Sequence, residues 1–201
     1  MSTPTIKSRP QYQRLQAVPT ADKNLVAAEG EGIQAVIRMM SKAPSGFARR
    51  THVLHAEAGF PLPHELDRLR EFGTGAIDEL GDTDEALRVL DRSLEAAAMG
   101  TQLYAAGSES FLGRVVQLAV RHGIEHDTVV TELLGSHARR VQCVHCKQTS
   151  EHVTLSVFEC PGCGTLLFVR DHYSRRLAAF QGVCANAEDP SEHPPSEELY
   201  R

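Results

Sequence analysis

The 201-residue sequence contains no run of apolar residues close to the ~20 that a membrane-spanning helix needs. Residues 1–10 contain no apolar core of the kind found in secretory signal peptides. The formal net charge is −5, whereas general nucleic-acid-binding proteins are usually basic. We therefore expect a cytoplasmic protein whose main partners are neither membranes nor nucleic acids.

Common catalytic motifs are also missing. The sequence has no phosphate-binding loop of the Gly-Lys-Ser type, no evident Ser/His/Asp arrangement and no evident pair of catalytic carboxylates. It has no internal repeats, and its hydrophobic content of 41% is ordinary for a globular protein with one sizeable core and a small satellite domain. We expect a chain that is not a catalyst on its own.

Cysteine is scarce, but four of the five cysteines lie in one short stretch. Cys143 and Cys146 form a Cys-x-x-Cys pair, and after thirteen intervening residues Cys160 and Cys163 form a second. Two pairs at this separation let two tight turns close on one tetrahedral metal ion, which four sulfurs would shield from substrate. Gly164 suits the left-handed backbone position that follows such a turn. The pattern predicts a structural Zn²⁺ site at Cys143, Cys146, Cys160 and Cys163.

Other states of these cysteines stay open. They could be two reduced dithiols or two disulfides, although an intracellular chain with paired spacing favours a metal. Iron in a rubredoxin-like site is a further alternative, since Cys-Pro-Gly-Cys-Gly also occurs there. His145 lies inside the first pair, where we expect a turn residue or an outer contact of the metal site. Cys184 lies outside the cluster and is expected to be an ordinary free thiol.

Residues 22–135 alternate predicted strands and helices. Strands are expected at residues 25–28, 51–56, 75–80, 101–106 and 128–133. One helix is expected at residues 33–40. A second is expected from Pro61 and Pro63 onward, with Leu66, Leu69 and Phe72 on one face. Two more are expected, one after the capping residue Asp82 and one after Ser108. This alternation predicts βαβ units on a parallel sheet, the α/β class.

We divide the chain into four parts from composition and motifs. These are an N-terminal arm over residues 1–21, the α/β domain over 22–135, a four-cysteine zinc ribbon over 136–184 and a loose acidic tail over 185–201. The ribbon strands are expected at residues 150–159 and 165–170.

The order of elements in residues 22–135 resembles the NAD(P)H-binding half of ferredoxin reductase-like oxidoreductases, particularly the phthalate dioxygenase reductase type. The similar stretches are residues 25–40, 101–123 and 127–133, and the resemblance implies a Rossmann-like parallel sheet. An unrelated α/β sheet remains the alternative. The sequence has no stretch for a flavin barrel upstream and no plant-type iron–sulfur loop downstream.

The residues that would contact a nucleotide in such a reductase are replaced. Glu29 and Glu31 flank Gly30 where the family presents a glycine-rich turn to pyrophosphate, and even well-screened repulsion costs on the order of 1 kcal/mol per charge pair. The family's Thr-Pro, Arg-Ser and Cys-Gly-Pro correspond here to Gln34-Ala35, Glu57-Ala58 and Ala106-Gly107-Ser108. We expect a degenerate domain that no longer binds nucleotide.

The chain as a whole resembles the small subunit of bacterial dimethylamine monooxygenases, the DmmA family. The resemblance covers nearly everything except the acidic tail and is clearest in residues 6–10, in the turn at 28–32, and in the cysteine stretch running into 169–178. It implies a non-catalytic subunit that organises a hetero-oligomer. A haem-containing catalytic subunit and a flavin and iron–sulfur reductase subunit would oxidise dimethylamine with NADPH and O₂, giving methylamine and formaldehyde. The alternatives are an NAD(P)H-binding electron-transfer component and a nucleic-acid-binding zinc ribbon.

The histidines and arginines outside the cluster carry weaker hypotheses. His52 and His55 lie in a predicted strand, and we expect neither to bind metal. His172 and Tyr173 lie beside several arginines, which could form either a solvated rim or a docking patch, because arginine and tyrosine are favoured at interface hot spots. The arginines concerned are Arg170, Arg175 and Arg176.

Overall fold

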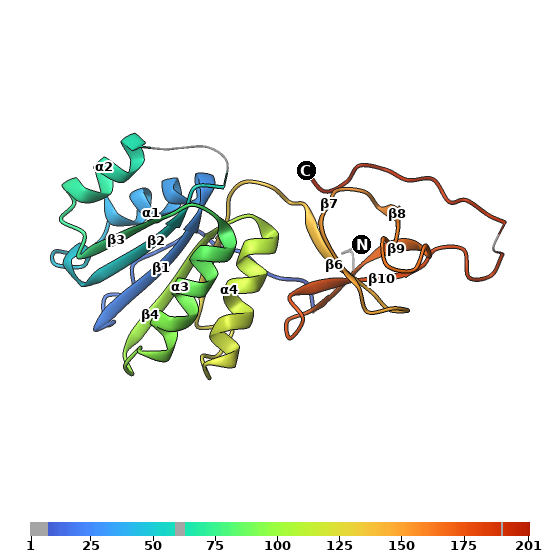
Figure 1. Cartoon of the computed structure of the whole chain (residues 1–201). Helices are drawn as coiled ribbons and strands as arrows, with labels where there is room; N and C mark the ends of the chain where they lie inside the picture. Colours follow the sequence, from blue (N-terminus) through green and yellow to red (C-terminus); the bar gives the residue numbers. More distant parts are fainter. Residues whose placement is uncertain (1–7, 59–62, 190) are drawn as a thin grey trace, which may run out of the picture. The chain divides into compact units, whose positions relative to one another are not determined.

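The computed structural model describes residues 8–58, 63–189 and 191–201. The chain divides into two compact units, one formed by Tyr12–Gly135 and the other by the segment up to Gln11 together with Ser136–Arg201. Figure 1 shows helices and strands in the first unit and mainly strands in the second. None of the described helices is both long enough and apolar enough to span a bilayer.

The first unit contains a five-stranded parallel sheet, which confirms the predicted α/β class. Its strands lie in the order β3-β2-β1-β4-β5, and each neighbouring pair is parallel. The strands are β1 (Lys23–Glu29), β2 (Thr51–Ala56), β3 (Ala76–Leu80), β4 (Thr101–Gly107) and β5 (Val130–Leu133). This order outward from a central β1 is that of a Rossmann-like sheet.

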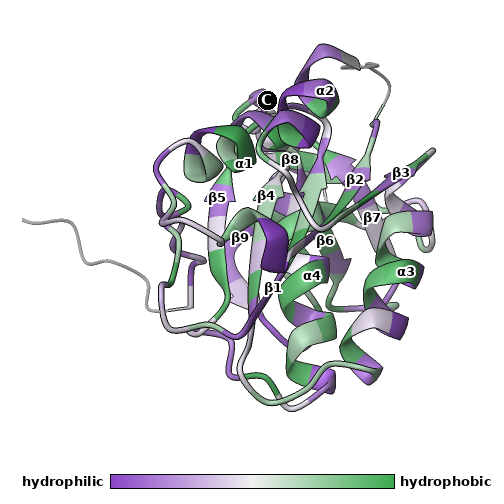
Figure 2. Cartoon of the chain, turned by 90° about the vertical axis from the view of Figure 1, so that its left-hand side faces the viewer, coloured by the Kyte–Doolittle hydropathy of each residue, from purple (hydrophilic) through white to green (hydrophobic). Residues whose placement is uncertain are grey.

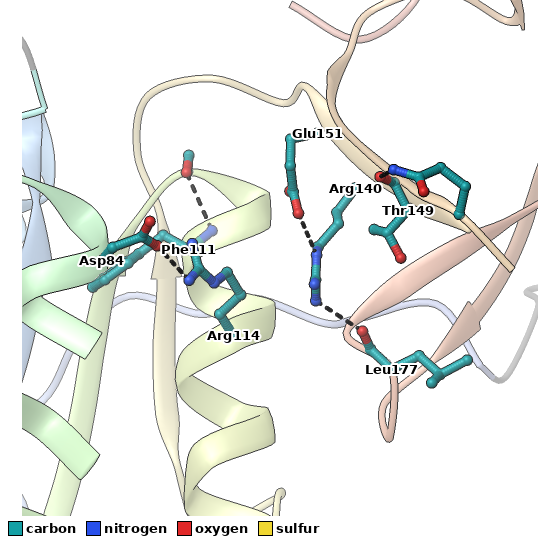
Figure 3. A network of polar contacts seen from close by, with 9 residues as sticks. Asp84, Phe111, Arg114, Arg140, Thr149, Glu151 and Leu177 are labelled. Carbon is teal, nitrogen blue, oxygen red and sulfur yellow. Dashed lines mark hydrogen bonds and ion pairs between the residues drawn. The ribbon is translucent and has the colours of Figure 1, made fainter. Parts of the chain in front are cut away.

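Helices cover both faces of this sheet. Helices α1 (Ile33–Met40) and α2 (Pro63–Glu71) pack on one face, and α3 (Thr83–Glu95) and α4 (Glu109–Arg121) on the other (Figure 1). Two short 3₁₀ turns, η1 (Gly30–Gly32) and η2 (Ala48–Arg50), precede α1 and β2. The Asp84–Arg114 ion pair, 2.5 Å between Oδ1 and Nη2, joins α3 to α4 (Figure 3).

The core follows the alternation of side chains along the central strand. Leu25 and Ala27 of β1 pack against α3 and α4, whereas Val26 and Ala28 pack against α1 and α2. Because both faces are covered, the strand is apolar throughout rather than alternating. In Figure 2, green residues run along α4 and the central strands, while α2 is largely purple. The sheet therefore supports two separate hydrophobic layers.

Most predicted helix signals are confirmed. Asp82 caps α3, because its Oδ1 accepts a hydrogen bond from Glu85 N at 2.7 Å. Leu66 and Leu69 of α2 are buried, but Phe72 is 36% exposed, so its predicted place on the buried face is wrong. Helix α2 ends at Glu71, so Phe72 no longer follows the helical repeat. The predicted helix start at Pro61 lies outside the described residues.

The second unit contains a five-stranded sheet in the order β7-β6-β10-β9-β8. Its strands are β6 (Arg139–Cys143), β7 (Thr149–Val153), β8 (Val157–Glu159), β9 (Leu166–Ser174) and β10 (Ala179–Cys184). All neighbours are antiparallel except β6 and β10. The stretch predicted as one strand at 150–159 is two strands, and β6 and β10 were not predicted. Arg140 links β6 to Glu151 of β7 and to the carbonyl of Leu177 (Figure 3).

The segments at both chain ends make backbone contacts within their own units. Residues 12–21 belong to the α/β unit, where Gln13 N donates to Thr131 O at 2.8 Å and Leu15 is buried. In the second unit, Leu199 N donates to Thr154 O at 3.0 Å. The backbone of residues 197–200 thus pairs with residues 154–156 between β7 and β8, which gives the last residues an ordered place.

Candidate metal centre

The structure brings the four clustered cysteines together. Their sulfur atoms all lie within 4.8 Å of one another, with Cys143 and Cys160 buried and Cys146 and Cys163 exposed. Two sulfur pairs that cross between the Cys-x-x-Cys turns lie 3.9 Å apart for Cys143–Cys163 and 3.6 Å apart for Cys146–Cys160. Each turn therefore contributes one buried and one exposed sulfur to a common cluster.

These distances fit a single tetrahedral metal ion. A Zn–S bond of about 2.3 Å implies sulfur–sulfur separations of about 3.8 Å at the corners of a tetrahedron. A disulfide would need about 2.05 Å, and all five cysteines are free. The donor set of four sulfurs suits zinc or iron and leaves no open coordination position.

The two cysteine turns have the same backbone design. In the first, Cys143 O accepts from Lys147 N at 3.0 Å, and in the second, Cys160 O accepts from Gly164 N at 2.9 Å. Lys147 has φ 68° and Gly164 has φ 72°, so both adopt the left-handed conformation. The prediction for Gly164 is confirmed, and the sequence offered no sign that Lys147 takes the equivalent position.

Local hydrogen bonds make the two exposed sulfurs unequal. A contact with the Thr165 hydroxyl, 3.3 Å from Cys163 Sγ, and the Thr165 backbone N–H lower the pKa of Cys163 to about 5. The backbone N–H of Gln148 favours the Cys146 thiolate, but burial and the neighbouring cysteine sulfurs raise its pKa to about 12. In both turns, a backbone N–H group therefore approaches the second cysteine.

The carboxyl edge of the parallel sheet, where such folds usually bind ligands, is occupied by a side chain of the protein itself. Glu29, at the end of β1, accepts hydrogen bonds from Ser108 N at 3.2 Å and from Thr83 Oγ1 at 2.6 Å. Ser108 caps α4, so the Glu29 carboxylate lies at the N-terminus of that helix, where a phosphate would bind. A Cβ at Gly107 would come within 2.9 Å of Glu29 Cβ, so glycine permits this approach.

A second carboxylate at this edge is also engaged. Glu132 of β5 is buried, accepts from Leu15 N at 2.7 Å and pairs with Arg38 of α1. These contacts tie the segment before β1, the first helix and the last strand together. The carboxyl edge is therefore lined with internally paired negative charge.

Comparison with known proteins places the chain in a family. The model described as "Dimethylamine monooxygenase subunit DmmA-like, N-terminal domain" matches residues 4–129, and the corresponding C-terminal domain model matches residues 140–183. The chain belongs to this family. It is 30% identical over 183 residues, 91% of both chains, to the protein named "Heme-dependent oxidative N-demethylase delta subunit" of Ectopseudomonas mendocina (strain ymp).

Solved structures similar to this DmmA-like chain include the ferredoxin reductase of carbazole 1,9a-dioxygenase, with a TM-score of 0.43 and 14% identity over 60% of this chain. The flavohemoglobin of Malassezia yamatoensis matches with a TM-score of 0.42 and 16% identity, also over 60% of this chain. The chain spans 36% and 33% of the lengths of these two proteins.

The other candidate residues of this DmmA-like chain have ordinary contacts. His52 Nε2 lies 3.0 Å from Asp78 Oδ2, and His55 Nε2 lies 3.3 Å from Gly30 O. His145 contacts the Cys163 sulfur and lowers its pKa, although less than Thr165 does. The exposed triplet Glu125, His126 and Asp127 also brings three possible ligand atoms together. Sequence reasoning missed this triplet because nothing in three consecutive polar residues distinguishes it from a surface turn.

Of the residues that could form either a solvated rim or a docking patch, Tyr173 is not on the surface. Tyr173 is buried and packs edge to face on Phe180, with ring centroids 4.9 Å apart. It therefore belongs to the core of the ribbon and is not available to a partner. His172 and the three nearby arginines, Arg170, Arg175 and Arg176, are exposed. Cys184 is exposed too, with its Sγ 3.5 Å from Asn186 Oδ1.

Proposed function

We propose that this chain is the small, non-catalytic subunit of a multi-subunit, heme-dependent oxidative N-demethylase. One observation carries the proposal: the similarity to the Ectopseudomonas mendocina delta subunit extends over 91% of both chains. The proposed complex oxidises dimethylamine to methylamine and formaldehyde with NADPH and O₂. Haem lies on a catalytic subunit, and flavin and an iron–sulfur centre lie on a reductase subunit.

An organising role is supported by the carboxyl edge of the α/β unit. Glu29 places a carboxylate at the N-terminus of α4, beside the turn after β1 that corresponds to the pyrophosphate-binding turn of the reductases this domain resembles. An anionic ligand would have to displace this carboxylate and tolerate the buried Glu132. In our proposal NADPH therefore binds to a partner, and this domain contributes surface and shape to the complex.

In the same proposal, Cys143, Cys146, Cys160 and Cys163 hold a structural Zn²⁺ ion in the cytoplasm. The convergence of the four sulfurs within 4.8 Å supports this assignment. A closed ZnS₄ centre supplies rigidity and carries no electrons. Residues of this chain would fix the two turns around the metal, and no step of the oxidation would take place at the site.

The complex is tested by purifying the full chain with an affinity tag from cells that grow on dimethylamine. We expect it to elute with a haem protein that has a Soret band and with a flavin protein, in a fraction that forms formaldehyde from dimethylamine and NADPH. Elution of the chain alone, from cells whose extract has this activity, would overturn the proposed subunit role.

The metal is tested separately by elemental analysis and a visible spectrum. We expect about one zinc per chain and no visible absorption, whereas a rubredoxin-like iron site would be coloured. Cys160→Ser should lose the metal, because three sulfurs cannot replace the closed site. Cys184→Ser, which changes a cysteine outside the cluster, is the matched control and should retain it. Full metal content in Cys160→Ser would rule out the assigned ligands.

A further inference from the structure

The α/β unit has a cleft at the amino edge of its parallel sheet, opposite the edge occupied by Glu29. The cleft has a volume of about 490 Å³ and lies among the starts of β1, β2, β3 and β4, next to the end of α3. This volume falls within the range of about 300–1,000 Å³ that is typical of small-molecule sites.

Positive side chains dominate the polar part of this lining. Lys23, Arg49 and Arg50 contribute three cations, and Asp22 contributes the one carboxylate. His52 also lines the cleft but is already paired with Asp78. The Asp22 carboxylate packs against Gly100, where an added Cβ would come within 2.5 Å of its Oδ2. The cleft therefore has an excess of positive charge in a chain whose net charge is −5.

The two arginines are held differently. The Arg50 side chain is held by the backbone carbonyls of two other residues, since its Nη1 donates to Ala21 O at 2.9 Å and its Nε donates to Gly46 O at 3.4 Å. Arg49 makes no side-chain hydrogen bond or ion pair within the part of the chain that the structure describes. Its backbone is fixed nonetheless, because Gly75 packs so closely that an added Cβ would lie 2.5 Å from Arg49 O. A fixed guanidinium thus lies next to an unengaged one.

The rest of the lining is made of polar and small apolar residues, among them Thr51, Ser93 and Thr101. The apolar side of the cleft, including Leu25 and Ala76, would cover a compact hydrocarbon group.

We propose that this cleft binds a small organic anion, a carboxylate or phosphate monoester with a compact apolar body. Arg49 and Lys23 contact the anionic group, and Arg50 supports it. Guanidinium groups bind both carboxylates and phosphates through paired N–H donors, so the two ligand classes share this chemistry. The proposal does not depend on the demethylase assignment.

The test follows backbone amide signals of the ¹⁵N-labelled full chain by NMR during titration with phenyl phosphate, benzoate and the neutral benzyl alcohol. We expect saturable shifts at the amides of Asn24, Thr51 and Thr101 with one or both anions, and none with the alcohol. Saturation by one anion identifies the preferred class, and saturation by both supports a general anion site. Shifts that fail to saturate, or an equal response to benzyl alcohol, would overturn the proposal.

Three variants make the assignment specific. Arg49→Ala should weaken binding about fivefold or more, because it removes the unengaged guanidinium without breaking a described contact. Arg68→Ala removes an exposed arginine of α2 away from the cleft and should change the affinity less than about twofold. Lys23→Ala, which removes the other cation proposed to contact the anionic group, should also weaken binding while the dispersion of the spectrum remains that of a folded chain. Equal affinities of the two arginine variants would contradict the site.

Discussion

Glu29 places a carboxylate of the protein itself at a helix N-terminus, where it also contributes to the stability of the fold. Its carboxylate accepts hydrogen bonds from the Ser108 hydroxyl and backbone at the start of α4 and from Thr83 at the start of α3. A negative group at a helix N-terminus is favourable because it interacts with the positive end of the helix dipole. The same position in a nucleotide-binding sheet would be filled by phosphate.

We therefore predict that Glu29→Gln lowers the free energy of unfolding by about 1 kcal/mol. The amide keeps one acceptor oxygen but loses the charge at the α4 N-terminus. Urea unfolding followed by circular dichroism measures the change. Glu31→Gln, at an exposed position two residues away, is the control and should stay within about 0.5 kcal/mol of the natural protein. Equal effects of the two substitutions would contradict the role of Glu29.

We expect the free energy of unfolding to depend on pH because His55 is buried. Burial lowers its pKa below the ordinary value of 6.5, and this outweighs the Gly30 carbonyl and the nearby Glu57, Glu79 and Glu65, which raise it. The unfolded chain therefore binds a proton at this residue more readily than the folded chain. Its contribution to stability is present above pH 6.5 and is lost as the pH falls below that value.

We expect the free energy of unfolding to fall between pH 7 and pH 5.5 by up to about 1.4 kcal/mol per pH unit from this residue. His55→Gln removes the titrating ring and should flatten the dependence, whatever its effect at pH 7. Urea unfolding at both pH values compares the two slopes. His126→Gln, at an exposed position, should keep the natural slope. An unchanged slope in His55→Gln would show that other groups are responsible.

At the scale of elements, the two cysteine turns are equivalent in backbone but not in sequence. Gly164 and Lys147 hold the same left-handed position, which costs a residue with a Cβ about 1–2 kcal/mol. A Cβ at Gly164 would meet Glu159 Oε1 at 3.6 Å, an ordinary contact, so backbone strain is its main cost. We predict that Gly164→Ala lowers the stability of the ribbon by about 1 kcal/mol.

Lys147→Gly provides the opposite change at the matching position. It relieves the strained backbone, although the greater freedom of glycine in the unfolded chain offsets part of the gain. We expect a small increase in stability, about 0.5 kcal/mol, measured by chemical denaturation of the metal-loaded chain. Destabilisation of similar size by both substitutions would show that the two turns are not equivalent.

The elements that could be predicted from sequence are those with a local signal. The helix at Ile33–Met40 and the strand at Thr51–Ala56 coincide with the predicted residues because apolar spacing and flanking prolines and glycines define them. The four cysteine ligands were predictable for the same reason, since their spacing alone defines the turns. Strand β10, with its central Gly182, has no such signal and is held by its neighbours β6 and β9.

Long-range contacts explain what the sequence could not show. Arg139 is 3% exposed and lies between the rings of Phe180 and Tyr200, 3.9 Å from each centroid, while its Nη2 pairs with Asp171 at 2.7 Å. A buried arginine needs such partners, because an unpaired charge in a core is strongly unfavourable. The acidic composition of residues 185–201 predicted a loose tail, whereas Tyr200 packs on Arg139 and its backbone pairs with Thr154.

At the scale of the whole molecule, the α/β unit and the ribbon have separate hydrophobic cores. The two large hydrophobic clusters lie entirely within the α/β unit, whereas the clusters around Val141 and Cys143 belong to the ribbon. The ribbon clusters are small, so we expect the ribbon to depend on the proposed metal for stability, as small domains often do. We expect no such dependence for the α/β unit.

We predict that removing the metal with a strong chelator unfolds the ribbon and leaves the α/β unit folded. All four described α-helices lie in the α/β unit, so the circular dichroism signal at 222 nm should decrease by less than about a fifth. Amide signals of residues 139–184 should lose their dispersion in the NMR spectrum, while those of residues 23–133 stay in place. Restoring Zn²⁺ should recover both. Collapse of the helical signal together with the ribbon would show that the two units unfold cooperatively, and an unchanged ribbon would show that the four cysteines need no metal to hold their turns.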